Sequence, residues 1–168
     1  NSVSWSERIR AAFGVMLALS AIIGIGLFLS KHENSAPWVV ASMGASAFLI
    51  FVLPSSPMAQ PWAVIGGSCI SALVGVLCSR WFNPIMLAIP IAVGLAILAM
   101  FTLRCLHPPA AALALLIPFN SIQDFSFIFS PVLGNALMLI VCASFYNTLT
   151  GKPYPHKLKP VSVSYTHL

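Results

Sequence analysis

The residues best placed for chemistry lie in the segment Arg104–Ala110, which reads Arg-Cys-Leu-His-Pro-Pro-Ala. The residue before a proline is pushed out of the helical region, so we expect His107 at a break between two apolar runs. Pro108 and Pro109 can open a helix, and the peptide dipoles of that helix favour negative charge near its start. Arg104 adds a permanent cation. The segment predicts a site for a small anion; the alternative is that Arg104 extends to the lipid headgroups and His107 caps a kink.

Two further segments place polar side chains within or beside the apolar runs. Gly44, Ala45 and Ser46 are consecutive in a short apolar run, where small residues let a ligand or a neighbouring helix approach closely and Ser46 supplies a hydroxyl. Gln60, in an irregular Pro-rich connection, can bond a substrate or satisfy loose backbone carbonyls, and we favour the carbonyls. The candidate binding residues are Gly44, Ala45, Ser46, Gln60, Arg104, His107, Pro108 and Pro109.

The sequence offers little for catalysis or for metal binding. No nucleophile–base pair, phosphate loop or pair of carboxylates stands out, so we expect that the chain is not an enzyme. The histidines and cysteines are not at metal-ligand spacing, so neither a metal nor another cofactor is expected. Asp124 is the only acid after Glu33, and its place in a loop predicts a solvated carboxylate.

The composition places these groups in a membrane. Of 168 residues, 59% are hydrophobic and 7% are charged, and the mean hydropathy is +0.96. An ordinary soluble domain has roughly 25% charged residues. The net charge of +5 lies mostly near the chain ends, which indicates membrane topology and not a nucleic-acid partner. We therefore predict an all-α integral membrane protein whose partners are the lipid bilayer and a small inorganic anion.

Some apolar runs are long enough to cross a hydrocarbon core of roughly 30 Å. The long runs are Ile9–Ser30, Trp62–Ser79, Ile85–Leu103 and Phe127–Tyr146. Two shorter runs, Trp38–Leu53 and Pro109–Phe119, are bracketed by prolines and suit broken, tilted or re-entrant helical segments. The expected fold is a bundle of four full transmembrane helices with two short Pro-bounded segments in residues 1–150, followed by a cytoplasmic tail, 151–168. The order long, short, long occurs twice, which favours an internal two-fold repeat with the site at the short segments.

The distribution of Lys and Arg places both termini on the cytoplasmic side but allows two topologies. Six crossings put Arg104 inside and both Lys31 and Arg80 outside, whereas four crossings with two re-entrant loops put Arg80 inside and both Lys31 and Arg104 outside. Each topology leaves six of the eight positive residues inside. Six crossings would make the halves inverted repeats, and four would make them parallel repeats.

The third run carries a face of small residues. Gly67, Ser71 and Gly75 recur at every fourth position and therefore lie on one side of a helix. Such a face predicts a close helix–helix contact, within a subunit or between subunits.

Three motifs, in this order, resemble those of the HPP family of membrane proteins. They are Gly-Ala-Ser-Ala at 44–47, Ser-Pro-Met-Ala-Gln-Pro at 56–61 with Gly-Gly at 66–67, and Leu-His-Pro-Pro-Ala at 106–110. The resemblance covers nearly the whole chain and implies a four-helix membrane protein. It marks His107, Pro108 and Pro109, the segment 44–47, and Gln60 with Pro61 as site residues. Family members in cyanobacteria and plastids are implicated in nitrite transport, and many bacterial members continue into soluble CBS domains.

Two departures from the family pattern affect the expected site. Many members place an arginine where this chain has Trp62, and many have Ala-Gly-Ala-Thr where residues 110–113 read Ala-Ala-Ala-Leu. An anion site would therefore depend on Arg104, His107, Ser46 and backbone N–H groups.

We accordingly expect a transporter or channel for a small inorganic anion, with nitrite leading, in the bacterial cytoplasmic membrane. Because so short a chain has few helices to surround a transport pathway, we expect a homo-oligomer, with a dimer preferred. If His107 acts as a cation, transport should be stronger at mildly acidic pH and fade above about pH 6.5. The alternative is a membrane-embedded sensor or anchor for a C-terminal regulatory domain of the CBS type, without transport activity.

Overall fold

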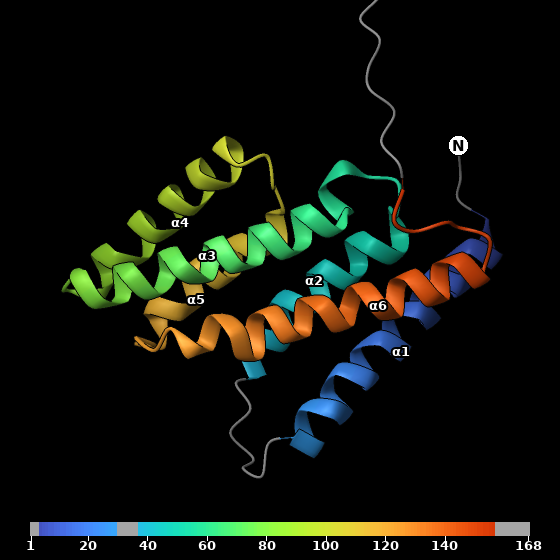
Figure 1. Ribbon diagram of the computed structural model, residues 1–168, viewed down its shortest axis with the longest axis horizontal. Coiled ribbons are helices and arrows are strands. Elements are labelled where there is room, and N and C mark those ends of the chain that lie inside the picture. The colour runs from blue at the N-terminus through green and yellow to red at the C-terminus, as the bar shows by residue number, and fades with distance from the viewer. Residues whose placement is uncertain (1–3, 30–36, 157–168) are drawn as a thin grey trace, which may run out of the picture.

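The computed structural model describes residues 4–29 and 37–156, and the regular elements in these ranges are all helical (Figure 1). The long apolar elements are α1 (Trp5–Leu29), α3 (Pro61–Trp81), α4 (Ile85–Thr102), and η3 (Ile128–Leu133) continued by α6 (Gly134–Leu149). The shorter elements are α2 (Pro37–Val52), η1 (Pro57–Ala59), η2 (Pro108–Ala110) and α5 (Ala111–Phe119). Four helical segments are long and apolar enough to cross a membrane and two are shorter, which confirms the predicted fold class. Lys31 and the tail residues 157–168 lie outside the described residues.

Proline determines where several helices begin. Pro61 is the first residue of α3, where its missing N–H would have had no partner within the helix. His107 has an extended backbone (φ −136°, ψ 93°) directly before Pro108, as expected for a residue that precedes proline. Pro90, in contrast, lies inside the continuous helix α4.

The last long segment is less regular than the sequence indicated. We expected one span over Phe127–Tyr146, but the backbone of Ser130 is extended (φ −136°, ψ 117°) and interrupts the helical conformation within η3. Ser130 precedes Pro131, whose ring disfavours helical geometry at the residue before it. The regular helix therefore begins only at Gly134.

Successive helices run in alternating directions (Figure 1). The loop after α2 lies at the start of α3, where the Gln60 side chain donates to the Pro54 carbonyl at 2.9 Å. The loop after α5 lies at the other end of α3, where Arg80 Nε donates to the Gln123 carbonyl at 2.6 Å. Because α3 is long enough to cross a membrane, these loops belong to opposite sides of the bundle. Of the two predicted topologies, this arrangement corresponds to six crossings, in which successive helices alternate in direction and the two halves are inverted repeats. We call it the alternating topology.

The two halves of the chain exchange their third helices. α3 packs mainly against α4 and α5 of the second half, whereas α6 packs against α1 and α2 of the first half. Ala47 of α2 and Leu139 of α6 share one buried cluster, and Ala92 of α4 and Ala114 of α5 share another with α3. The third helix of each half thus packs on the long and short helices of the other half, a reciprocity that agrees with the predicted internal repeat.

The small-residue face of α3 lies against the second half of the chain. A Cβ atom added at Gly75 would lie 3.0 Å from Cβ of Ile117 in α5. At Gly67 it would lie only 2.7 Å from Cβ of His107. The predicted close contact is confirmed within the subunit, and it includes the residue that the sequence analysis ranked first for chemistry.

Candidate functional site

His107 lies where the chain turns back into the bundle after α4. The carbonyl of Leu103 accepts a hydrogen bond from Trp62 Nε1 at 3.3 Å, next to the first residue of α3, whereas His107 lies against Gly67. Gly67 follows Pro61 by six positions, so His107 lies about 9 Å along the axis of α3 from its first residue. Its side chain has no exposed surface. The His-Pro-Pro motif therefore begins a short helix inside the bundle.

Both ring nitrogens of His107 have hydrogen-bond partners on other elements. Nδ1 lies 2.8 Å from the carbonyl oxygen of Met58 in η1, and Nε2 lies 2.8 Å from Oγ of Ser46 in α2. A carbonyl can only accept, so the network assigns a proton to Nδ1. The Ser46 hydroxyl also lies 3.1 Å from the Ser42 carbonyl. Three elements, α2, η1 and the start of η2, thus meet at one imidazole.

The hydroxyl of Ser46 can serve either protonation state of that imidazole. When the ring is neutral, Ser46 donates its proton to Nε2. When the ring is charged, Nε2 donates to Oγ of Ser46, which in turn donates to the Ser42 carbonyl. Neither state leaves a ring nitrogen without a partner. The same three contacts can therefore be kept in both protonation states of the ring.

Ser42 joins the two short segments a second time. Its hydroxyl donates to the carbonyl oxygen of Pro109 at 3.1 Å. Ser42 and Ser46 are one turn apart on the same face of α2, and both are buried. Ser42 was not among the predicted site residues, although its spacing from Ser46 was a usable signal.

The other predicted residues lie away from the imidazole or are held by other partners. Gly44 is half-buried with nothing within 4 Å of an added Cβ, and Ala45 is exposed. Pro108 is exposed as well. The amide of Gln60 donates to the carbonyls of Pro54 and Ser56, both at 2.9 Å, the role we favoured for it.

Arg104 is exposed and lines a cavity of about 280 Å³. Arg104 is the charged residue of this cavity. The other lining residues are Pro57, Met58, Ala63, Met100, Phe101 and Leu106. Met58 also supplies the carbonyl that His107 bonds. Arg104 is therefore exposed whereas His107 is buried, and Met58 contacts both the cavity and the imidazole.

Ser68 is a buried polar residue next to Gly67 in α3. Its side chain has no exposed surface, and its Oγ has no hydrogen-bond partner among the described residues. Buried hydroxyl groups are normally hydrogen-bonded, so this oxygen is available to a water molecule or another ligand.

Comparison with known proteins agrees with this arrangement of motifs. Residues 1–155 match the family described as HPP, transmembrane region. The chain belongs to this family. The HPP chain is also similar to two transmembrane proteins of Dictyostelium discoideum. One is 34% identical over 150 residues, covering 82% of this chain and 48% of the relative. The other is 37% identical over 128 residues, covering 70% of this chain and 44% of the relative.

The HPP chain thus spans about half the length of the curated relatives it matches. No solved structure matches it.

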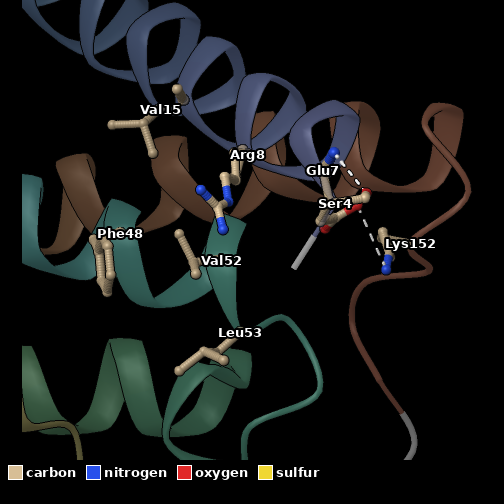
Figure 2. A pocket seen from close by; sticks show the side chains of 10 residues that line it. Ser4, Glu7, Arg8, Val15, Phe48, Val52, Leu53 and Lys152 are labelled. Atoms are coloured by element: carbon tan, nitrogen blue, oxygen red, sulfur yellow. Dashed lines mark hydrogen bonds and ion pairs between the residues drawn. The ribbon is translucent and has the colours of Figure 1, made fainter. Parts of the chain in front are cut away.

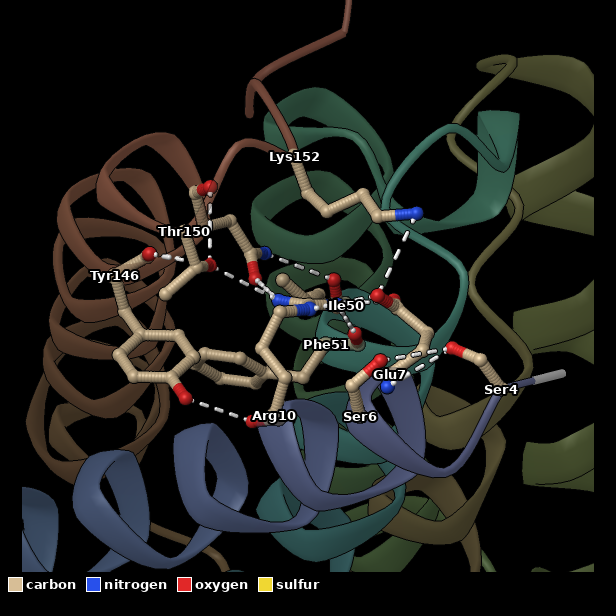
Figure 3. A network of polar contacts seen from close by, with 10 residues as sticks. Ser4, Ser6, Glu7, Arg10, Ile50, Phe51, Tyr146, Thr150 and Lys152 are labelled. Atoms are coloured by element: carbon tan, nitrogen blue, oxygen red, sulfur yellow. Dashed lines mark hydrogen bonds and ion pairs between the residues drawn. The ribbon is translucent and has the colours of Figure 1, made fainter.

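In this HPP protein, α2 is fixed at its C-terminal end by a network that the sequence analysis missed (Figure 3). The last carbonyls of a helix have no partner within it. Asn147 of α6 donates to the carbonyl of Ile50 at 3.2 Å, and Arg10 of α1 donates to that of Phe51 at 2.9 Å. Arg10 also donates to Oδ1 of Asn147 at 2.8 Å and pairs with Glu7 at 2.7 Å. An asparagine in an apolar run was the available signal.

After α6, the chain of this HPP protein returns to η1 and contacts Ala59 and Gln60. The hydroxyl of Tyr154 donates to the carbonyl of Ala59 at 2.7 Å, and the backbone N–H of His156 donates to Oε1 of Gln60 at 2.9 Å. Tyr154 is 3% exposed, and its burial raises the pKa of the phenol. Residues 58–60 thereby connect the described part of the tail with His107.

Asp124 lies at the opposite end of the HPP bundle. Its carboxylate is exposed and accepts the N–H of Ser126 at 2.9 Å, which lowers its pKa. The predicted solvated loop carboxylate is confirmed. Within residues 4–29 and 37–156, no three His, Cys, Asp or Glu side chains gather as metal ligands.

Proposed function

We propose that this HPP protein is a transporter or channel for a small inorganic anion, with nitrite as the first candidate, and not an enzyme. The observation that carries the proposal is the 2.8 Å contact between His107 and Ser46, which joins the two short segments inside the bundle. Transporters use helix breaks inside the bundle as substrate sites. The imidazole can add a positive charge at this break by taking up a proton.

Arg104 supports an entrance to this site. An exposed cation in a cavity of about 280 Å³ raises the local concentration of anions. Met58 borders this cavity, so an anion held there would lie close to the carbonyl that His107 bonds.

We further propose that the end of the bundle with Arg8, Arg10, Arg104 and Lys152 faces the cytoplasm, in a bacterial cell across the cytoplasmic membrane. The excess of positive residues at this end supports the orientation, because cytoplasmic loops carry more Lys and Arg. Arg80 then belongs to the outer face. The protein would work as a homo-oligomer, with a dimer preferred, because so short a chain offers few helices to surround a pathway.

The experiment that tests transport is nitrite flux into liposomes containing the purified protein, with nitrate, formate and chloride as competitors. His107→Ala should abolish the flux. His156→Ala is the matched control, because that side chain is exposed and only its backbone N–H is bonded. Flux that survives His107→Ala would exclude the site, and absence of flux for all four anions with folded, inserted protein would exclude transport.

A second candidate function is a membrane-embedded sensor or anchor for a C-terminal regulatory domain, with no flux of its own. The docking of the tail favours it, because Tyr154 and His156 bond the residues that directly follow Met58. A change at His107 would reach the tail through this segment. A fluorophore on Pro153→Cys, in a chain without other cysteines, that responds to nitrite in vesicles showing no flux would favour the sensor.

A further inference from the structure

A groove lies between α1 and α2, on the outside of the bundle (Figure 2). Its volume is about 920 Å³, within the range of roughly 300–1,000 Å³ that small-molecule sites occupy. The apolar walls are formed by Ala11, Ala12, Val15, Phe48, Val52 and Leu53. The polar residues Ser4, Glu7, Arg8 and Lys152 gather at one end. The groove is thus amphipathic along its length.

The apolar part of the groove faces outward. Phe48 is 58% exposed and Leu53 is 51% exposed, so in a membrane both contact the hydrocarbon of the bilayer. Val15 follows Arg8 by seven positions, which extends the apolar wall about 10 Å from the charged end. An acyl chain can occupy such a wall, whereas a small inorganic ion gains nothing from it.

The charged end of the groove has a net positive charge. Glu7 is paired with Arg10 at 2.7 Å and with Lys152 at 3.6 Å, so its carboxylate is already compensated. The guanidinium of Arg8 lies 4.9 Å from the ring centre of Trp5, which is 75% exposed, as is usual for an aromatic residue at headgroup level. Basic pockets between transmembrane helices on the cytoplasmic side bind anionic headgroups.

We infer that this groove binds an anionic glycerophospholipid, with its phosphate at Arg8 and Lys152 and one acyl chain between α1 and α2. The inference is independent of the proposed transport function. The groove is charged at the helix ends and apolar toward the hydrocarbon. A phospholipid likewise has a charged headgroup and an apolar acyl chain, so the two match.

Native mass spectrometry of the purified chain tests this inference. The protein is mixed with equal amounts of phosphatidylglycerol and phosphatidylcholine that carry the same acyl chains. We expect at least about tenfold more of the phosphatidylglycerol adduct, because each surface cation adds roughly 1 kcal/mol to the binding of an anionic lipid. The double variant Arg8→Gln, Lys152→Gln should lose this preference. Arg104→Gln removes one positive charge outside the groove and should keep the preference, whereas each of the single variants Arg8→Gln and Lys152→Gln should reduce it.

A second variant tests the apolar wall. Ala12 is exposed on α1, so Ala12→Trp fills the groove from its surface and should leave the melting temperature unchanged while both lipid adducts disappear. Equal retention of the two lipids by the wild type would overturn the inference. So would a loss of preference in Arg104→Gln equal to that of the double variant. If Ala12→Trp dissociates an oligomer and keeps its phosphatidylglycerol, the groove holds a second subunit and the inference is wrong.

Discussion

Nε2 of His107 and Oγ of Ser46 lie 2.8 Å apart, although 61 residues separate them in the sequence. Both side chains are fully buried; Ser46 lies in one short Pro-bounded segment, and His107 directly precedes the prolines that begin the other. A hydrogen bond between two helices in an apolar bundle adds little energy by itself, roughly 0.6 kcal/mol on average. Its significance is positional, because it aligns both segments on one group that can bind a proton.

Ser46→Ala should lower nitrite flux and alter its dependence on pH, because the imidazole loses the partner that serves both of its protonation states. Stability should fall by about 1 kcal/mol, since Nε2 is left buried without a hydrogen bond. Flux from pH 5 to 8 and thermal unfolding in detergent measure the two effects. Ser55→Ala, at an exposed serine, is the matched control. A wild-type pH profile in Ser46→Ala would show that the hydroxyl has no part in protonation.

Gly67→Ala should displace the His-Pro-Pro segment. The added Cβ would lie 2.7 Å from Cβ of His107 and 2.9 Å from the Cys105 carbonyl, and neither atom belongs to the flexible end of a side chain. We expect a lower melting temperature and loss of flux. Gly94→Ala in α4 meets nothing within 4 Å and should be neutral or stabilising, because alanine favours a helix over glycine by about 1 kcal/mol. Equal melting temperatures for both variants would contradict the close contact.

Asn147→Leu should destabilise the protein by about 1–3 kcal/mol, because it removes the donor to the Ile50 carbonyl and the acceptor of Arg10. Chemical or thermal unfolding measures the change. Asn135→Leu replaces the same residue type on the same helix, where the side chain is half-buried. That variant should be at least as stable as the wild type, and a similar loss in both would indicate that the network does not hold α2.

Tyr154→Phe should weaken the docking of the tail in a pH-dependent way. Burial raises the pKa of the phenol above its ordinary value of 10.0, so the folded state favours the neutral form. The stabilisation from this group is therefore fully present below pH 10 and is lost as the pH rises through 10 toward the raised pKa. Wild type should be more stable than Tyr154→Phe by about 1 kcal/mol at neutral pH.

The gap in melting temperature between these two proteins should shrink between about pH 9 and about pH 11. The difference between them isolates Tyr154 from other groups that titrate in the same range. A gap that stays constant across this range would mean that the phenol is not buried in the folded tail.

Cysteines at Ser55 and Ser121, placed singly in a chain without Cys69, Cys78, Cys105 and Cys142, should be labelled from opposite sides of the membrane. The two loops lie at opposite ends of α3, as the contacts of Gln60 and Arg80 show. An impermeant maleimide applied to oriented vesicles, before and after permeabilisation, measures the side. Labelling of both positions from one side would exclude the alternating topology.

Much of the fold was predictable because hydropathy and proline act locally. The long apolar runs became membrane-length helices, and the break before Pro108 is a steric consequence of the proline ring. The same rule was available for Ser130 and Pro131, but the uninterrupted hydropathy of that run concealed the break. Local signals thus locate the ends of segments more reliably than irregularities inside them.

The geometry of the site was less accessible, because it depends on which helix faces pack together. The sequence singled out both His107 and Ser46 but could not show that they bond each other, nor that Met58 binds the other ring nitrogen. It grouped Arg104 with His107 because they are close in sequence, whereas in the structure Arg104 is exposed and His107 is buried. Spacing predicts neighbours within a helix and loses that power across a break.

The exchange of third helices between the two halves has a consequence for synthesis. α1 and α2 leave the ribosome first, but the cluster around Ala47 also needs Leu139 of α6, which is made after α3, α4 and α5. The early helices therefore remain incompletely covered in the membrane until α6 is inserted. Neither half contains all the parts of its own core, so cutting the gene between α3 and α4 would yield two fragments that insert separately and mature only together.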